Sequence, residues 1–412
     1  PVFIGIRCMP ILKDGQDTLT LGDILAPMTE AEFFQDYYDK KPLHIPGSAD
    51  KFKGIMDWSI LNELLSNGPL WSAKSLGLQI DKQPIPAALY CESREDRSGS
   101  MVMQPIAGKV MDLLHQGASL IANDIDMMSR PLRQVASAFE AAYNGKAQAN
   151  LYCSWDSRQA FSSHFDTHDV FALHIEGEKT WRVFETRMPH PIRHARHSNG
   201  AYTEAQHMEQ RGELLFDVVL KPGDILYLPR GQYHDALAVS SGAVHIALGI
   251  VSLVGLDIVD ALKDFAVEDE AFRLNLPRLA QGETATRSVL EDLGNKLHQL
   301  SKNPNVLAAL LQYQASYSYD RSQYTLPIES TDKQFNLVDG PFRLVKDKGT
   351  FVLTGPRGAV PVPPGSEGPI SWILSQKRFR RGAFLSAHER LPAAAADRLL
   401  SDLQSMGVLK SA

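Results

Sequence analysis

The chain has 412 residues, 44% of them apolar and 22% charged, which is the composition of a globular protein with two or three domains. It contains no apolar run of about 18 residues and no secretory signal at its start, so we expect neither a membrane span nor export. The net charge is −6, and from Gly340 onward eleven basic and five acidic residues give +6, so the rest carries −6 − 6 = −12.

Three scattered cysteines, Cys8, Cys91 and Cys153, form no Cys-x-x-Cys pair. This usage argues against a disulfide framework or a zinc–cysteine site and indicates a reducing, cytoplasmic compartment.

Residues 1–20 form a poorly determined lead-in, and residues 21–149 have mostly helical patterns. Thr29 and Glu32 make a capping signal for an amphipathic helix that runs into Pro42. Residues 57–68 have helical apolar spacing and end at an Asn-Gly pair.

From Asn150 to Leu253 short strands alternate with turn residues. Residues 169–177 and 178–185 predict a strand pair broken at Gly177, and residues 213–239 predict two or three more strands. A last strand is expected within residues 243–253. Evenly spaced short strands favour a β-sandwich or barrel.

Helical periodicity returns in residues 256–272 and 287–300. An apolar stripe in the second stretch favours a core-facing helix, with a dimer-forming module as the alternative; it consists of Leu290, Leu293, Leu297 and Leu300.

The tail predicts strands over residues 342–354, a Pro-rich link over 359–369, and helices over 370–380 and 391–409. A small domain of winged-helix type fits this order.

The main chemical signal is His164-Phe165-Asp166 followed by Gly223-x5-Pro229-x-Gly231-x2-His234. Residues two apart in a strand face the same side, so His164 and Asp166 can point into one interior. Pro229 and Gly231 supply a turn that delivers His234. Two imidazoles and one carboxylate can bind one face of Fe(II) and leave positions open for exchangeable ligands. Manganese suits the same ligands, and a buried histidine satisfied by a carboxylate is the non-metal alternative.

Lys179 stands at every-second spacing with Trp181 and Val183, so it is expected on their inward face. A lysine inside a barrel needs an anionic partner. A dicarboxylate cosubstrate would supply one, and a protein salt bridge is the alternative.

Two further charged stretches have less specific patterns. Residues 187–207 hold four histidines at spacings that match no metal template, which favours a solvated loop over a second metal site or a substrate lid; they are His190, His194, His197 and His207. The basic run 377–381 with Phe379 inside it could contact nucleic acid, but a solvated helix face is favoured.

Residues 150–185 and 222–237 resemble the JmjC-type, cupin-4 family of 2-oxoglutarate oxygenases, and within it the ribosomal oxygenases. The resemblance extends over most of residues 21–412. It implies an α+β fold: a JmjC/cupin catalytic domain over 21–253 with its double-stranded β-helix at about 150–253, a helical dimerisation segment over 254–325, and a winged-helix-like domain over 326–412.

The resemblance also implies roles for residues. His164, Asp166 and His234 would be the catalytic iron ligands, and Lys179 would hold the distal carboxylate of 2-oxoglutarate. Asn150 and Tyr152 match polar positions that help to hold this cosubstrate. One further residue of the last core strand, His245, lies near a position that lines the family's site, and no role is assigned to it.

The activity implied is an Fe(II)-, 2-oxoglutarate- and O₂-dependent dioxygenase that hydroxylates a protein side chain. A basic protein, in particular a ribosomal protein, is the expected substrate because the catalytic region is acidic. A homodimer is expected, without membrane association, and nucleic acid is a partner that is not favoured. Alternatives are a demethylase or a tRNA or small-molecule hydroxylase of the same fold, and a non-catalytic DNA-binding cupin.

Overall fold

The structure is a computed structural model that describes residues 11, 19–95, 99–155, 161–239, 242–321, 333–347, 349–356 and 358–411. The chain divides into two compact units, residues 1–322 and 323–412. The expected lead-in lies outside the described residues except for Ile11, Leu19 and Thr20. The domain boundary expected at residue 325 also lies outside them.

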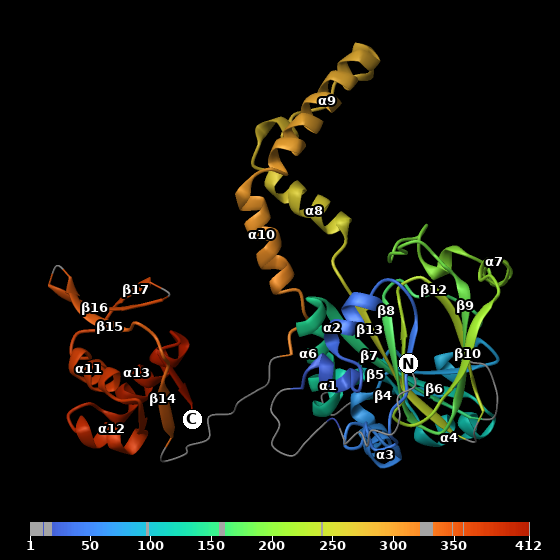
Figure 1. Cartoon of the computed structure of the whole chain (residues 1–412), viewed down its shortest axis with the longest axis horizontal. Helices are drawn as coiled ribbons and strands as arrows, with labels where there is room; N and C mark the ends of the chain where they lie inside the picture. The colour runs from blue at the N-terminus through green and yellow to red at the C-terminus, as the bar shows by residue number, and fades with distance from the viewer. Residues whose placement is uncertain are drawn as a thin grey trace. The chain divides into compact units, whose positions relative to one another are not determined.

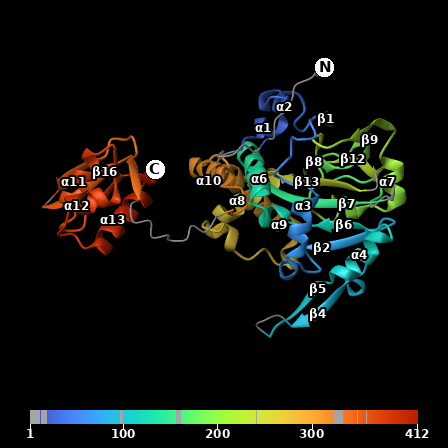
Figure 2. The same ribbon diagram turned by 90° about the horizontal axis from the view of Figure 1, so that it is seen from below.

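Two antiparallel sheets form the centre of the first unit (Figure 1). The larger sheet has the order β1-β11-β8-β13-β7-β6-β2-β3, and the smaller has the order β10-β9-β12. A two-stranded hairpin, β4-β5, extends from the body (Figure 2). The strands are β1 (Leu43–Ile45), β2 (Leu76–Ile80), β3 (Gln83–Pro84), β4 (Cys91–Glu95), β5 (Met101–Pro105), β6 (Ser119–Ala122), β7 (Lys146–Ser154), β8 (Asp169–Glu176), β9 (Lys179–Arg187), β10 (Leu214–Leu220), β11 (Ile225–Leu228), β12 (Gln232–Ala238) and β13 (Ala243–Val251).

Helices cover the outer face of the larger sheet. Phe33 of one helix lies 4.9 Å from Tyr227, and Phe139 of another lies 4.6 Å from Phe171, measured between ring centroids. All four rings are fully buried, so this aromatic layer holds the helices on the sheet. The helices of this region are α1 (Leu21–Leu25), α2 (Glu30–Asp36), α3 (Trp58–Ser66), α4 (Ala107–His115), α5 (Ile125–Met128), α6 (Arg130–Tyr143) and α7 (Glu204–Gln210).

The structure corrects two expectations for this unit. Residues 21–149 are not mostly helical, because six of the strands, β1 to β6, lie in this range. These strands are two to five residues long, too short to show an alternating pattern. In addition, β8 and β9 do not pair with each other but lie in opposite sheets. Gly177, with φ of +69°, lies in the turn where the chain crosses between them.

Three helices follow β13: α8 (Gly255–Ala266), α9 (Gly282–Leu300) and α10 (Pro304–Ala315). We refer to residues 255–315 as the helical segment. The expectation that the leucine stripe faces the core is wrong, because α9 has no buried residue and Leu290 is 71% exposed. None of the described helices is long and apolar enough to span a membrane.

The second unit has its own apolar core, which includes Phe335, Ile373, Phe384 and Leu400. Two three-stranded sheets, β18-β14-β19 and β15-β16-β17, accompany three helices. The elements are β14 (Gln334–Leu337), β15 (Arg343–Asp347), β16 (Thr350–Gly355), β17 (Gly358–Pro361), α11 (Glu367–Ser375), β18 (Arg378–Arg380), α12 (Arg381–Ala387), α13 (Ala393–Ser405) and β19 (Leu409–Ser411).

The basic run 377–381 does not lie on one helix face, because α11 ends at Ser375, Arg378–Arg380 forms a strand and α12 begins only at Arg381. Phe379 is buried and stacks on Phe335 with ring centroids 5.5 Å apart. Arg381 binds Asp397 through two hydrogen bonds of 2.6 and 2.8 Å. Within the run, Phe379 thus belongs to the core and Arg381 forms an ion pair.

Candidate metal centre

The two histidines and the aspartate of the sequence motifs meet between the sheets. One ligand atom from each of His164, Asp166 and His234 lies within 4.8 Å of the other two. His164 and His234 are joined as an isolated β-bridge, with backbone hydrogen bonds of 3.0 and 2.9 Å. Within the described part of the chain, this is the one group of three or more such residues.

Local structure explains why the pair His164 and Asp166 points inward. Phe165, the residue between them, is fully buried on the other side in a cluster with Phe184 and Tyr233. This burial fixes the alternation that turns both flanking side chains into the pocket. The site thus depends on an apolar anchor as well as on its polar residues.

Both imidazoles are oriented by backbone carbonyls. His164 Nδ1 lies 2.8 Å from the carbonyl oxygen of Ser162, and His234 Nδ1 lies 3.0 Å from that of Gln232. When Nδ1 donates a proton to a carbonyl, Nε2 is left with a free lone pair. The Nε2 of His234 lies 3.6 Å from Asp166 Oδ2. The donor set therefore fits a divalent metal ion.

Burial also keeps His234 in the neutral form that can bind a metal. It lowers the pKa of His234 to about 4, with repulsion from His164 acting in the same direction. Burial would raise the pKa of Asp166, but the neighbouring imidazoles, first that of His164, hold it below its ordinary value. A neutral imidazole and an ionised carboxylate are the states that ligate metals.

The triad opens into a pocket of about 580 Å³. Strands of both sheets line it, together with residues of the stretch 199–207. The lining includes Gln148, Asn150 and Tyr152 of β7, Lys179 and Trp181 of β9, and His245, Ala247 and Gly249 of β13.

Lys179 is a buried residue in the lining of this pocket. Its side chain is on the inward face of β9 with Trp181 and Val183, and burial lowers its pKa to about 8. Ser154 Oγ lies 3.5 Å from Nζ. No acidic side chain pairs with Lys179 among the described residues, so a protein salt bridge does not account for it.

Open hydrogen-bonding atoms accompany this lysine. Trp181 Nε1 and His245 Nδ1 are buried and have no hydrogen-bond partner in the described part of the chain. Burying polar atoms without partners costs free energy. An anionic ligand with several acceptor oxygens would therefore fit this part of the pocket.

Asn150 and Tyr152 line the same pocket on β7. The side chain of Asn150 accepts a 3.1 Å hydrogen bond from the backbone amide of Asp124. The ring of Tyr152 stacks on His245, with centroids 5.0 Å apart and planes 9° apart.

Three further histidines line the pocket without a role assigned from sequence. His245 faces it from the last core strand, near the expected position. His207 was expected in a solvated loop but is buried, 3.0 Å from the Tyr233 hydroxyl through Nδ1. His168 packs on Gly249, where a Cβ would lie only 2.3 Å from the imidazole. The glycine in a predicted strand was the available signal for this close contact.

The comparisons with known proteins agree with this fold. Residues 126–255 match the JmjC domain. A Drosophila willistoni protein named bifunctional lysine-specific demethylase and histidyl-hydroxylase NO66 is 28% identical over 229 residues, which are 55% of this chain and 28% of that protein. Ribosomal oxygenase 1 of Danio rerio is 26% identical over 262 residues, 62% of this chain and 45% of that protein.

Among solved structures, Escherichia coli YcfD aligns with a TM-score of 0.50 at 16% identity, covering 93% of this chain and 98% of that one. This likeness shows a shared fold. The chain thus contains a region, residues 126–255, that is similar to the JmjC domain. It spans less than half of the length of the curated relatives it matches.

Proposed function

We propose that this protein is an Fe(II)- and 2-oxoglutarate-dependent oxygenase that hydroxylates a protein side chain. The observation that carries the proposal is the meeting of His164, Asp166 and His234 in a pocket that the buried cation Lys179 also lines. Three nitrogen and oxygen ligands leave positions open on a metal, unlike the closed tetrahedral sites of structural zinc. Manganese would fit the same donors.

Each residue has a defined task in this proposal. His164, Asp166 and His234 would hold the metal, which together with 2-oxoglutarate would supply the chemistry for oxygen transfer from O₂ to an unactivated carbon. Lys179 would bind the distal carboxylate of the cosubstrate, and Asn150 and Tyr152 would order it from β7.

The test is succinate formation from 2-oxoglutarate with Fe(II) and O₂. Asp166→Ala should lower the rate at least about a hundredfold, because a carboxylate ligand is lost. Asp217→Ala is the matched control, since Asp217 is an exposed aspartate on β10, and it should keep full activity. Equal activity of Asp166→Ala and wild type would refute the metal assignment.

The leading substrate class is a basic ribosomal protein. The relative named ribosomal oxygenase 1 supports this class, and the −12 charge of residues before Gly340 suits a basic partner. Mass spectrometry of ribosomal proteins, with and without the enzyme, should show the mass of one added oxygen on one residue. Absence of any mass difference would direct the search to tRNA or small molecules.

Lysine demethylation is a second candidate, because the name of the Drosophila relative includes it. Hydroxylation of a methyl group on nitrogen leads to its release as formaldehyde, so the same site can perform both reactions. Incubation with methylated peptides distinguishes the two: demethylation gives a mass loss and formaldehyde, whereas side-chain hydroxylation gives neither.

The helical segment supports the further proposal of a homodimer. It exposes large apolar side chains to an extent that is unusual for a monomer; they include Leu256, Val259, Leu274, Leu276, Leu279, Leu290, Leu307 and Leu311. A second copy of the segment is the proposed partner, and burial of these side chains would stabilise the pair.

The second unit, with its three-helix and small-sheet composition, supports a winged-helix-like assignment. Nucleic-acid binding is not favoured there, because Phe379 and Arg381 of the basic run serve internal contacts. The free buried thiols of Cys91 and Cys153 support a cytoplasmic setting.

A further inference from the structure

Where β7 has no neighbouring strand on one side, side chains bind its backbone amides instead. On one side β7 pairs with β13 along its whole length, but on the other β6 reaches only Leu151–Cys153. The Ala149 amide instead donates to Asp126 Oδ1 at 2.8 Å, and the Ala147 amide donates to Glu140 Oε1 at 3.1 Å. Two carboxylates, one from α5 and one from α6, thus replace an edge strand.

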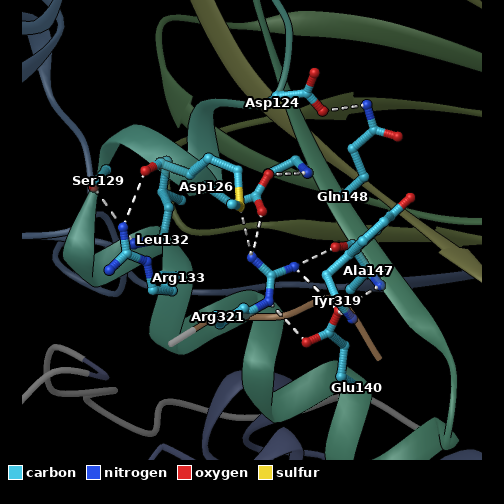
Figure 3. Close-up of polar contacts among 12 residues, drawn as sticks. Asp124, Asp126, Ser129, Leu132, Arg133, Glu140, Ala147, Gln148, Tyr319 and Arg321 are labelled. Atoms are coloured by element: carbon cyan, nitrogen blue, oxygen red, sulfur yellow. Dashed lines mark hydrogen bonds and ion pairs between the residues drawn. The ribbon is translucent and has the colours of Figure 1, made fainter. Parts of the chain in front are cut away.

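Arg321 binds both of these carboxylates and the strand itself (Figure 3). Its Nε donates to Glu140 Oε2 at 2.7 Å, and its Nη1 donates to Asp126 Oδ2. Its Nη2 donates to the carbonyl oxygen of Ala147. The three charged side chains are 3 to 7% exposed, so the cluster is compensated internally.

This arginine belongs to the chain that returns from the helical segment. Tyr319 of the same stretch donates its backbone amide to Glu140 Oε1 at 3.1 Å. Lys146, the first residue of β7, lies 4.7 Å from the ring centroid of Tyr317. The segment leaves the sheet after Val251, and Val251 is the partner of Lys146 in the β7–β13 register. Both ends of the helical segment are therefore attached at one end of this strand pair.

The side chains of β7 alternate between the cluster and the pocket. Ala147 and Ala149 are fully buried in the core beneath the helices, whereas Gln148, Asn150 and Tyr152 line the pocket. Asp124, next to α5, adds two further bonds to this strand: its amide donates to Asn150 Oδ1, and its Oδ1 accepts from Gln148 Nε2 at 2.6 Å. A shift of β7 at Ala147 or Ala149 would thus move the pocket wall.

We propose that Arg321 is a positioning residue: it fixes β7 against α5 and α6, and it thereby couples the helical segment to the pocket wall that carries Gln148, Asn150 and Tyr152. The effect of Arg321 on the cosubstrate rests on the proposed function. The role of Arg321 in fixing β7 does not depend on that function.

The test compares Arg321→Lys with wild type in the full chain. Lysine keeps the positive charge but lacks the planar fork that reaches two carboxylates and a carbonyl together. Arg133→Ala is the matched control, since Arg133 lies on α6 and binds the carbonyl oxygen of Met127, at 3.0 Å, rather than β7.

Hydrogen–deuterium exchange of the metal-free protein is the first measurement. The amides of Ala147 and Ala149 should exchange about tenfold faster in Arg321→Lys, while β8 of the same sheet and the Arg133→Ala control stay unchanged. Unchanged protection of β7, or equal acceleration in β7 and β8, would overturn the proposal, since the second outcome is general destabilisation.

Kinetics is the second measurement. The KM for 2-oxoglutarate should rise about tenfold with less than a twofold change in kcat, because the lost order affects binding of the cosubstrate. If the amides of β7 exchange faster in Arg321→Lys but the KM is unchanged, Arg321 does not act on the pocket wall. If wild type fails to turn over 2-oxoglutarate, the proposed function falls, and the exchange result alone decides whether Arg321 fixes β7.

Discussion

Lys179 is the residue whose chemistry the fold alters most directly. It is 4% exposed, and its ammonium group has lost most of its water without gaining a carboxylate partner among the described residues. Burial lowers its pKa to about 8 from an ordinary value of 10.5. Between these two pH values the unfolded chain holds more protons at this site than the folded one. The free energy of unfolding therefore increases, as far as Lys179 contributes to it, when the pH rises from 8 to 10.5. Below pH 8 the folded protein carries the whole cost of the buried charge.

This titration predicts how the proposed binding of 2-oxoglutarate depends on pH. A bound carboxylate favours the charged amine, so binding above pH 8 must take up a proton, and affinity should fall by up to about tenfold per pH unit. Calorimetric titration with Mn(II) in the absence of O₂, from pH 7 to 9.5, measures it. Lys179→Arg, whose guanidinium stays charged, should give a nearly constant affinity. A constant affinity in wild type would show that Lys179 does not bind the cosubstrate.

At the scale of elements, the turn from β11 to β12 places His234. Gly231 in this turn has φ of +88°, and a Cβ there would lie 2.1 Å from the backbone oxygen of Met188. The turn is held further by the Gly231 amide, which donates to the Asp166 carbonyl at 2.9 Å. The glycine expected from the motif is thus needed both for its dihedral angle and for a close approach of two backbones.

Gly231→Ala should lower the free energy of unfolding by about 3 kcal/mol or more, which combines the dihedral strain with a backbone clash. Gly54→Ala is the matched control: Gly54 has φ of +80°, but a Cβ added there would meet no atom within 4 Å, so it should lose about 1 kcal/mol. Denaturant unfolding of both variants measures the difference. Equal losses would mean that the approach to Met188 contributes nothing.

Elements also differ in how far their sequence predicts them. Strands β8 to β13 follow the expected ranges closely, because each is bounded by turn residues and has a buried face. The strands β1 to β6 were not predicted, since each is only two to five residues long. Residues Arg378–Arg380 were predicted as helix but form a strand. The side chain of Phe379 in this strand packs in the core of the second unit.

At the scale of the whole molecule, the exposed helical segment predicts self-association. Leu290→Glu changes a side chain that is 71% exposed in the single chain, so the fold should persist while a dimer interface is disrupted. Sedimentation or light scattering should find a dimer for wild type and a monomer for this variant. Leu89→Glu, at a leucine that is 60% exposed and lies outside the helical segment, should remain dimeric. A wild-type monomer at micromolar concentration would contradict the proposed dimer.

The sequence by itself determined the candidate metal-binding residues, the turn before His234 and the inward-facing lysine, because these follow from local spacing. Only the tertiary structure decided what surrounds them. His207 lines the pocket, His168 packs against Gly249, and Arg321 binds Ala147 of strand β7, which lies 174 positions earlier in the chain. Such contacts depend on which distant segments pack together, and packing of that kind leaves no periodic signal along a single chain.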